Sequence, residues 1–312
     1  MKWPRFSRPP RRRVRHFEGV LGTALELQLL ANTDAQLDAA EAALLTELDR
    51  LELIFSRFVP ESELNRFLGS VGQSVAVSPE FAAVLAQAQH FITLTGGAFH
   101  PASDALARLW AAGEPDEQSL SGVLAQMREP LWTLQAGRAT LHTTLGLNFN
   151  ALAKGHIADQ AAAAALASAG VRAVLLNLGG DVRHLGASPV QVGVESFGLR
   201  SDTRAPLLHL ETCQQAVATS GHGHRGAHLF DPRTGYPTPT DRAVSVLAPT
   251  CAEADALSTA FCVLDISDSL RLADSLASVG VLIQDGATQR SNAFWQRHQV
   301  QEQVRESALT PL

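Results

Sequence analysis

The sequence is poor in lysine, tyrosine and cysteine, and each scarcity narrows the kinds of protein that it can encode. The three cysteines, Cys213, Cys251 and Cys262, are odd in number and lack the spacing of a metal cluster. We therefore expect no disulfide framework and interpret them as small core residues in a reducing compartment. The only lysine beyond the N-terminal tail, Lys154, and the only tyrosine, Tyr236, both fall inside polar motifs.

Long apolar stretches are also absent. No run of about twenty apolar residues occurs, so we expect no membrane-spanning helix. The arginines of residues 11–15 resemble the start of an export signal, but Glu18, Glu26 and Gln28 interrupt the apolar segment that should follow. No cysteine near the N-terminus offers a lipid anchor. These absences predict a cytoplasmic protein without stable membrane insertion.

The charge distribution separates a basic N-terminus from an acidic remainder. A net charge of −6 and a pI near 6.0 argue against a nucleic-acid partner, and 46% hydrophobic residues suffice for a full core. Residues 1–15 carry seven basic and no acidic side chains, which leaves −13 on the rest of the chain. We expect a disordered basic tail over 1–15, one domain over 16–298 and a loose tail over 299–312. Attraction of the basic tail to an anionic membrane or a partner is an alternative.

Hydrophobic periodicity predicts alternating strands and helices. The main strands are expected at 17–30 (with a bend at Gly22), 75–77, 131–135, 139–142, 173–178, 182–185, 190–195, 207–211, 216–218, 244–248 and 280–284. The main helices are expected at 35–55, 62–67, 79–94, 151–169 and 251–264, with a further helix ending at Trp110. Residues 113–130 are interpreted as variable surface.

The polar stretch of residues 218–237 is the most constrained part of the sequence. Pro232 and Gly235 favour a tight turn, and Asp231 and Arg233 stand two residues apart around it. Three histidines lie close by, so we expect this loop to place side chains for a ligand. The alternative is a hairpin in which Asp231 merely caps its own turn.

Two further motifs are suited to binding phosphate. Lys154 follows Asn148 and Asn150 at the start of a predicted helix, where free backbone N–H groups can assist a lysine in holding an anion. The alternative is a solvated lysine. The pair Gly96-Gly97 precedes another helix and forms either an anion cradle or an ordinary helix end.

One pair of residues is suited to a metal ion. Asp255 and Thr259 are four apart on a predicted helix, so a carboxylate and a hydroxyl share one face and can bind Mg²⁺. An N-cap-like aspartate and a core threonine are the alternative. The turn Gly179-Gly180-Asp181 departs from the GxGxxG pattern, so a dinucleotide would have to bind in another way. No GxxxxGK[ST], HExxH or GxSxG motif occurs.

Eight segments within residues 17–285 match, in order and spacing, the motifs of one family. They are FEGVLGTALEL (17–27), FSRFVPESELNRF (55–67), TGGAFHPASDALARLW (95–110), LNFNALAKGHIAD (147–159), VLLNLGGDVRHLG (174–186), AVATSG (216–221), HLFDPRTGYP (228–237) and ADALSTAF (254–261). Together they resemble the ApbE family, the FAD:protein FMN transferases. The chain carries His100 where that family usually has aspartate, and Phe58 where it usually has an aromatic hydroxyl.

The resemblance implies a fold and an activity. The fold is a single α+β body of antiparallel sheets with helices packed outside, similar to the T-fold, with FAD in a central cleft. The activity is Mg²⁺-dependent transfer of FMN from FAD to a threonine hydroxyl of a target protein, with release of AMP. Some members hydrolyse FAD to FMN and AMP instead, and a non-catalytic FAD-binding protein is a third possibility.

The resemblance also assigns residues to roles. Asp255 and Thr259 would be Mg²⁺ ligands, the backbone carbonyl of Ala151 a third ligand, and Ser258 would assist them. His228, before the DPxTG motif, would be the base for the attacking hydroxyl. The FAD site would be lined by Leu21, Phe58, Ala98, Phe99, His100, Asn148, Lys154 and Leu229.

Overall fold

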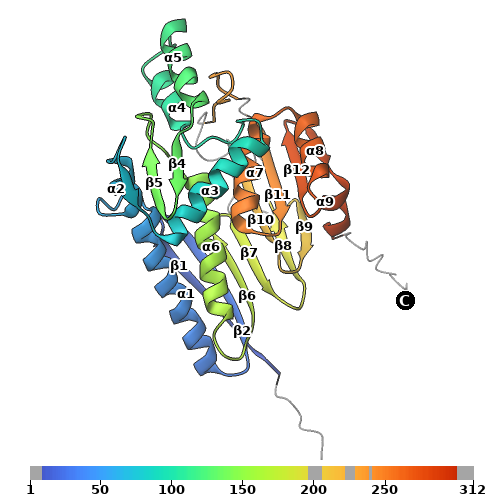
Figure 1. Cartoon of the computed structure of the whole chain (residues 1–312). Helices are drawn as coiled ribbons and strands as arrows, with labels where there is room; N and C mark the ends of the chain where they lie inside the picture. The colour runs from blue at the N-terminus through green and yellow to red at the C-terminus, as the bar shows by residue number, and fades with distance from the viewer. Residues whose placement is uncertain (1–8, 196–205, 222–228, 239–240, 301–312) are drawn as a thin grey trace, which may run out of the picture.

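A large antiparallel sheet runs through the computed structural model, which describes residues 9–195, 206–221, 229–238 and 241–300 (Figure 1). Its strand order is β1-β2-β6-β7-β10-β11-β12-β13. The strands are β1 (Arg11–Val20), β2 (Thr23–Ala31), β6 (Val171–Leu178), β7 (Asp181–Gly186), β10 (Ala216–Gly221), β11 (Arg242–Ala248), β12 (Gly280–Asp285) and β13 (Thr288–Ser291).

Four helices cover one face of this sheet and enclose the main core. In β2, the buried Leu25, Leu27 and Leu29 alternate with more exposed residues, so one side of the strand faces the helices. The first helix begins at a capping box formed by Thr33 and Gln36. The helices are α1 (Asp34–Phe55), α6 (Asn150–Leu166), α7 (Cys251–Val263) and α8 (Ile266–Ser275).

A smaller layer covers the opposite face. Val217, Leu247 and Leu282 point to that side and form a second core with Leu210 and the fully buried Trp295. The covering elements are the ribbon β8 (Val190–Val194) and β9 (Leu208–Thr212), together with α9 (Ala293–His298). The sheet therefore lies between two apolar layers over its central strands.

The segment between α1 and α6 forms a separate group at the upper left of Figure 1. A three-stranded sheet in the order β3-β5-β4 lies beside helices from the same segment, and α4 and α5 project at the top of the view. The elements are α2 (Glu63–Leu68), β3 (Ser74–Ala76), α3 (Pro79–Leu94), α4 (Asp104–Ala111), α5 (Glu117–Arg128), β4 (Trp132–Gln135) and β5 (Arg138–Leu141).

The predicted α+β class is confirmed, because every strand pair of the described residues is antiparallel and the helices pack outside the sheets. Two local predictions are wrong. The stretch 17–30 is not one strand but part of a hairpin, which turns at Leu21 and Gly22 with positive φ angles of 50° and 75°. Residues 113–130 contain α5, whose Leu120 and Met127 are buried.

The prediction of a disordered tail is wrong for residues 11–15, which belong to β1 and pair with β2. Alternate arginines of this strand reach the acidic side of α1. The ion pairs are Arg11 with Asp34, Arg13 with Asp38 and Glu41, and Arg15 with Glu41. Residues 1–8 lie outside the described part of the chain.

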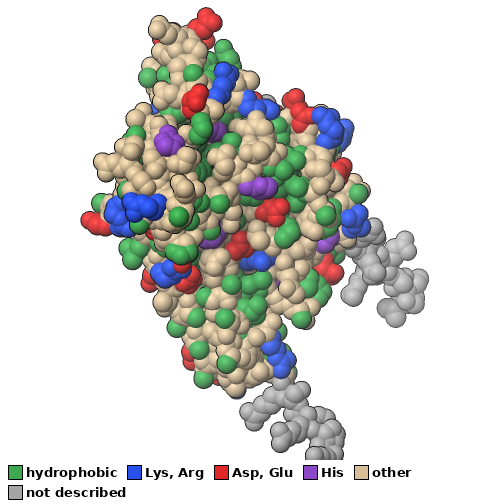
Figure 2. Space-filling view, viewed as in Figure 1, with side chains coloured by type: hydrophobic (Ala, Val, Ile, Leu, Met, Phe, Trp, Pro, Cys, Tyr) green, Lys and Arg blue, Asp and Glu red, His purple; other side chains and the backbone are tan. Residues whose placement is uncertain are grey.

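The described helices include none that is both long and apolar enough to cross a membrane. Figure 2 shows acidic and basic side chains interspersed over the visible face, without a large field of one sign.

Candidate active site

Helices α6 and α7 approach each other closely, and a glycine makes this possible. A Cβ atom on Gly155 would lie 2.4 Å from the carbonyl oxygen of Cys251 and 2.7 Å from the amide nitrogen of Ala252. Such distances are shorter than real contacts allow, so no larger residue fits without displacing α7. Gly155 therefore sets the spacing between the two helices that carry the predicted phosphate and metal residues.

Asp159 of α6 caps the start of α7. Its carboxylate accepts hydrogen bonds from the backbone N–H groups of Cys251, at 2.9 Å, and Ala252, at 3.0 Å. It also forms an ion pair with Arg183 of β7, at 2.9 Å. Arg183 in turn donates to the carbonyl of Pro249, just before α7, at 2.8 Å. Burial raises the pKa of Asp159, while the two N–H groups and Arg183 oppose this rise.

Lys154 interacts electrostatically with two carboxylates. It forms an ion pair with Asp181, the first residue of β7, which is 2% exposed. Burial tends to lower the pKa of Lys154, but the negative charges of Asp255 and Asp181 outweigh it, and the net shift is upward. Burial raises the pKa of the Asp181 carboxyl, which Lys154 opposes. The ammonium group therefore contacts Asp181, and the negative charges of Asp181 and Asp255 favour its charged form.

The face of α7 that carries Asp255 and Thr259 contacts the strand β10. Asp255 is 6% exposed, and Thr259 follows one turn later. The hydroxyl of Ser220 in β10 lies 2.8 Å from the hydroxyl of Ser258 and 3.1 Å from that of Thr259. Ser258 also donates to the carbonyl of Asp255 at 3.0 Å. Asp255 and Thr259 thus lie in one polar strip together with Ser220.

The residues before α6 connect it to the segment after α3. Asn148 donates from its backbone N–H to the carbonyl of Pro101, at 2.8 Å, and from its side chain to Asp104, at 2.9 Å. Its side-chain oxygen accepts the N–H of Asn150 at 2.9 Å. Asp104 also pairs with Arg57 at 3.1 Å. Asn148 therefore holds the first turn of α6 against the predicted nucleotide loop.

His100 is buried and neutral. Its Nδ1 accepts the N–H of Ala102 at 3.2 Å, so the proton lies on Nε2, which donates to the carbonyl of Met127 at 3.1 Å. Burial lowers the pKa of His100. Ala98 and Phe99 are each 2% exposed. All three side chains are turned into the protein, so a nucleotide at this loop would meet mainly backbone.

The other predicted lining residues are more dispersed. Phe58 is 81% exposed, with the Arg57 guanidinium 5.5 Å from its ring centre. Leu21 occupies the β1–β2 turn, and Leu229 accepts a hydrogen bond from the N–H of Thr238 at 3.0 Å. No contact joins these three side chains to Lys154 among the described interactions. His228 lies outside the described residues.

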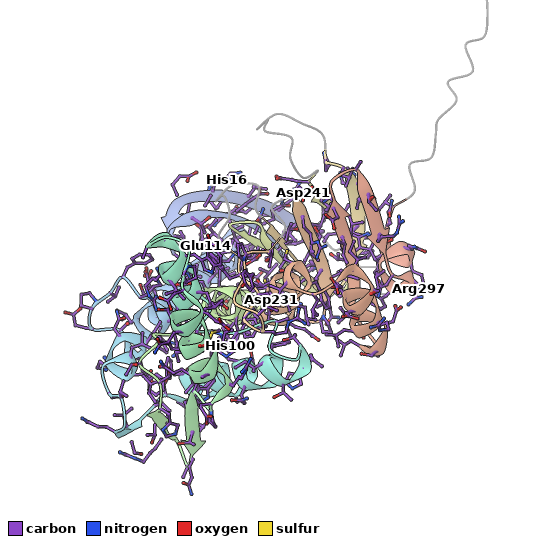
Figure 3. All side chains as sticks on the ribbon, turned by 90° about the horizontal axis from the view of Figure 1, so that it is seen from above. His16, His100, Glu114, Asp231, Asp241 and Arg297 are labelled. Atoms are coloured by element: carbon purple, nitrogen blue, oxygen red, sulfur yellow. The ribbon has the colours of Figure 1, made fainter. Side chains whose placement is uncertain are left out.

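The turn at Asp231 has the internal capping that the simpler interpretation predicted. The Asp231 carboxylate accepts the Arg233 N–H at 2.8 Å and pairs with its guanidinium at 2.8 Å. The turn docks on α4, because Trp110 donates its indole N–H to the carbonyl of Gly235 at 2.8 Å. Seen from above, His100 and Asp231 lie toward the middle of the molecule, whereas Arg297 lies at its edge (Figure 3).

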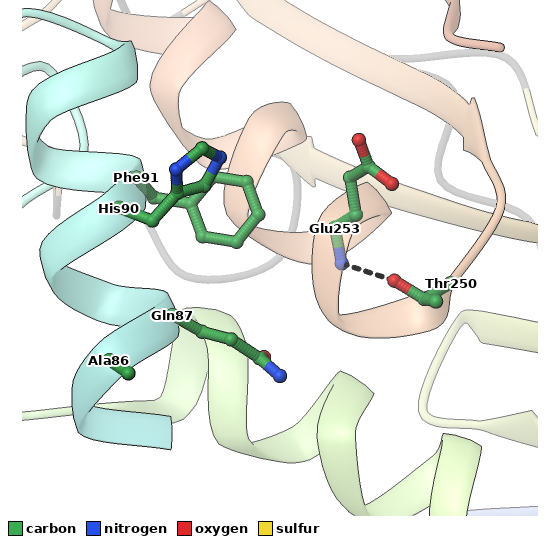
Figure 4. A pocket seen from close by; sticks show the side chains of 6 residues that line it. All are labelled: Ala86, Gln87, His90, Phe91, Thr250 and Glu253. Atoms are coloured by element: carbon green, nitrogen blue, oxygen red, sulfur yellow. Dashed lines mark hydrogen bonds between the residues drawn. The ribbon is translucent and has the colours of Figure 1, made fainter. Parts of the chain in front are cut away.

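Two surface hollows lie elsewhere. One, of about 430 Å³, is lined by six residues of α3 and the start of α7, including His90, Phe91 and Glu253 (Figure 4). The other, of about 410 Å³, lies around Cys213 and His298. Neither contains Lys154 or the oxygen strip of α7.

A comparison with protein families identifies the family that shares this sequence pattern. A model described as the ApbE family matches residues 21–283. The chain belongs to the ApbE family. It is 30% identical over 309 residues to the FAD:protein FMN transferase of Treponema pallidum (strain Nichols), covering 87% of this chain and 85% of that protein. The protein of the same name from Haemophilus influenzae is 30% identical over 272 residues, covering 77% and 78%. The family is thus one of transferase enzymes.

Solved structures share the fold. The ApbE protein of Thermotoga maritima superposes with a TM-score of 0.80 at 23% identity, over 93% of this chain and all of that chain. The Pseudomonas stutzeri flavinyl transferase ApbE in its apo form gives a TM-score of 0.77 at 21% identity, over 92% and 97%. These likenesses extend across nearly the whole of this ApbE-family chain.

The donor set around α7 fits Mg²⁺ better than a softer metal. The described residues form no cluster of three or more histidine, cysteine, aspartate or glutamate side chains. Asp255 instead offers a buried carboxylate and Thr259 a partly exposed hydroxyl, and hard oxygen donors of this kind suit Mg²⁺. The chemistry of these two donors would fit Mg²⁺.

Sequence reasoning missed three residues of this site. Asp181 stood in the turn Gly179-Gly180-Asp181 and received no ligand role, and Ser220 stood in the matched segment AVATSG without a role. Asp159 ended the segment LNFNALAKGHIAD. Its spacing of five from Lys154 was the available signal, but only the fold places both residues opposite β7.

Proposed function

We propose that this protein transfers the FMN moiety of FAD to a threonine hydroxyl of a target protein, using Mg²⁺ and releasing AMP. The observation that carries the proposal is the close approach of α6 to α7 at Gly155. It brings Lys154, which is paired with Asp181 on β7, next to the helix that carries Asp255 and Thr259. A cation near a pair of oxygen donors is what a diphosphate with its metal requires. The relatives named FAD:protein FMN transferase support the same activity.

The residues divide the work as follows. Asp255 and Thr259 hold Mg²⁺, with the carbonyl of Ala151 as a third protein ligand. Ser258 is fully buried and contacts Ser220, so its assistance is to hold the hydroxyl of Thr259 in place. When bound, Mg²⁺ supplies positive charge to the diphosphate. Lys154 adds charge at the same phosphates.

The nucleotide lies against Leu21, Phe58, Asn148 and Leu229, and against the backbone of residues 98–100. The threonine oxygen of the target forms a bond to the FMN phosphorus, and the bond from that phosphorus to the bridging oxygen breaks. AMP leaves with the bridging oxygen, and His228 takes the proton of the attacking hydroxyl. Positioning and charge neutralisation supply most of the rate.

The proposal is tested by incubating the purified protein with FAD, Mg²⁺ and a candidate acceptor protein, followed by mass spectrometry. We expect AMP together with an acceptor that has gained the mass of FMN on a threonine, and loss of both products in Asp255→Asn. Release of AMP and free FMN without any acceptor identifies a FAD pyrophosphatase instead. Bound FAD with no products in any condition contradicts catalysis altogether.

A further inference from the structure

Two ion pairs join α6 to the strand β7. Lys154 pairs with Asp181, and Asp159 pairs with Arg183. Asp181 and Arg183 are two residues apart in one strand, so their side chains leave the same face of the sheet. The charges alternate along both elements, and a shift of α6 along the strand would bring like charges together. The pairs therefore fix where α6 lies on β7.

The second ion pair also forms hydrogen bonds to the backbone at the beginning of α7 and just before it. Asp159 accepts the first two N–H groups of α7, at Cys251 and Ala252, while Arg183 donates to the carbonyl of Pro249 before the helix. The two side chains are only 13% and 10% exposed. A charged acceptor at unpaired helix N–H groups is a strong interaction in such an environment.

The two helices run antiparallel along this contact. Asp159 accepts hydrogen bonds from the first residues of α7, whereas the charge of Lys154, more than a turn earlier in α6, interacts with that of Asp255, a turn later in α7. Ala151 lies one turn before Gly155 in α6 and therefore shares the side of that helix that approaches α7. Any axial slip of α7 would change the distance between Ala151 and Asp255.

We infer that Asp159 is a positioning residue for the metal site. Through Arg183 and the N-terminus of α7, it sets the axial position of α7, and so of Asp255 and Thr259, relative to α6. This inference rests on the proposed function. Asp159 itself lies one turn beyond Gly155 and touches neither metal nor substrate. Asp159 fixes the register of α7 relative to α6, and Gly155 supports this register by allowing the two helices to approach closely.

The test measures Mg²⁺ binding to the full-length protein by calorimetry, with no flavin present. Asp159→Asn keeps the side-chain size but loses the ion pair and one acceptor, and we expect Mg²⁺ to bind at least about 10-fold more weakly. Gly155→Ala forces α7 away by a different route and should weaken Mg²⁺ binding in the same direction. If Asp159→Asn does not fold, Arg183→Gln decides the question, because it removes the same ion pair and the bond to the Pro249 carbonyl, and we expect the same weakening of Mg²⁺ binding.

Leu210→Ala is the matched control. Leu210 is fully buried in the second core, on the other face of the sheet, so this change lowers the melting temperature without touching α6 or α7. It should leave Mg²⁺ affinity unchanged. If it weakens Mg²⁺ binding as much as Asp159→Asn does, general destabilisation explains the effect and the inference is overturned.

Asp255→Asn separates the two ideas. If the parent protein binds Mg²⁺ and Asp255→Asn does not, the result supports the proposed Mg²⁺ site at Asp255. Unchanged binding in Asp159→Asn and Gly155→Ala then overturns the positioning role alone. If the parent shows no binding that depends on Asp255, the proposed metal chemistry fails and the positioning role fails with it.

Discussion

Lys154 is the residue on which the electrostatics of the site converge. Its ammonium group neutralises part of the charge of Asp181 and Asp255, which would otherwise repel both each other and a diphosphate. Arginine occupies most other basic positions of this chain, but a guanidinium is larger and flatter than an ammonium. A compact charge fits the space between α6, α7 and β7 better.

Lys154→Met should reduce AMP release from FAD by ~10²-fold, a loss typical of removing one charged group from a phosphoryl-transfer site. The protein should remain folded, because burial already raises the pKa of Asp181 and the lost cation lets that carboxyl take up a proton. Rates of AMP formation measured by chromatography test this. Arg271→Met, on the exposed side of α8, is the control and should keep full activity. Activity within threefold of the parent in Lys154→Met would contradict the role.

A buried histidine makes the fold sensitive to acid. His156 is 5% exposed and meets Phe55 edge-on at 5.7 Å. Burial lowers its pKa, with Glu80 and Glu47 opposing. The unfolded chain therefore binds a proton more readily than the native protein, and stability present above about pH 6.5 is lost as the pH falls through that value.

His156→Leu should reduce the loss of stability that occurs as the pH falls below about 6.5. Urea unfolding at pH 7.5 and pH 5.5 measures the free energy of unfolding in each protein. One such histidine contributes at most about 1.4 kcal/mol per pH unit, so the parent should lose more stability between these two pH values than the variant does. Equal losses in both proteins would show that His156 takes no part.

At the scale of elements, the sequence predicted most helices and strands but not their partners. The Asp255–Thr259 spacing identified one polar face of α7, and the periodicity of 35–55 located α1. Asp181 could not be assigned, because its partner Lys154 lies 27 positions earlier and only the α6–β7 packing joins them. His100 could not be interpreted from its neighbours either, since the burial that lowers its pKa arises from tertiary packing, and the carbonyl that accepts its Nε2–H belongs to Met127 in a helix that the sequence did not reveal.

The α4 helix holds the turn of residues 230–237 mainly through Trp110. Trp110→Phe keeps an aromatic ring near Phe230 and Tyr236 but loses the hydrogen bond to the Gly235 carbonyl. We expect a loss of about 1 kcal/mol in the free energy of unfolding. Hydrogen exchange should accelerate at the amides of Thr234 and Gly235 and stay unchanged in β11. Uniform acceleration over the whole protein would instead indicate global loosening.

At the scale of the whole molecule, the sheet joins the site to the N-terminal edge. Strand β1 is an edge strand, and its arginines tie it to α1, which packs on α6. The basic composition of residues 11–15 suggested disorder, because composition alone does not reveal the acidic row of Asp34, Asp38 and Glu41. Charge that looks unpaired in the sequence is paired across the fold.

Two truncations locate the beginning of the folded domain. Removing residues 1–10 leaves β1 whole, whereas removing residues 1–15 deletes half of the strand with the Arg11, Arg13 and Arg15 ion pairs. The shorter truncation should melt like the full chain. The longer one should melt at a lower temperature, by roughly 2–4 °C for each kcal/mol of stability lost. High salt should narrow this difference in melting temperature, because it screens the exposed ion pairs of the shorter truncation. It should not abolish the difference, because the shorter truncation keeps the hydrogen bonds between residues 11–15 and β2. Identical melting curves for the two truncations would restore the boundary at residue 16 and leave β1 without a stabilising role.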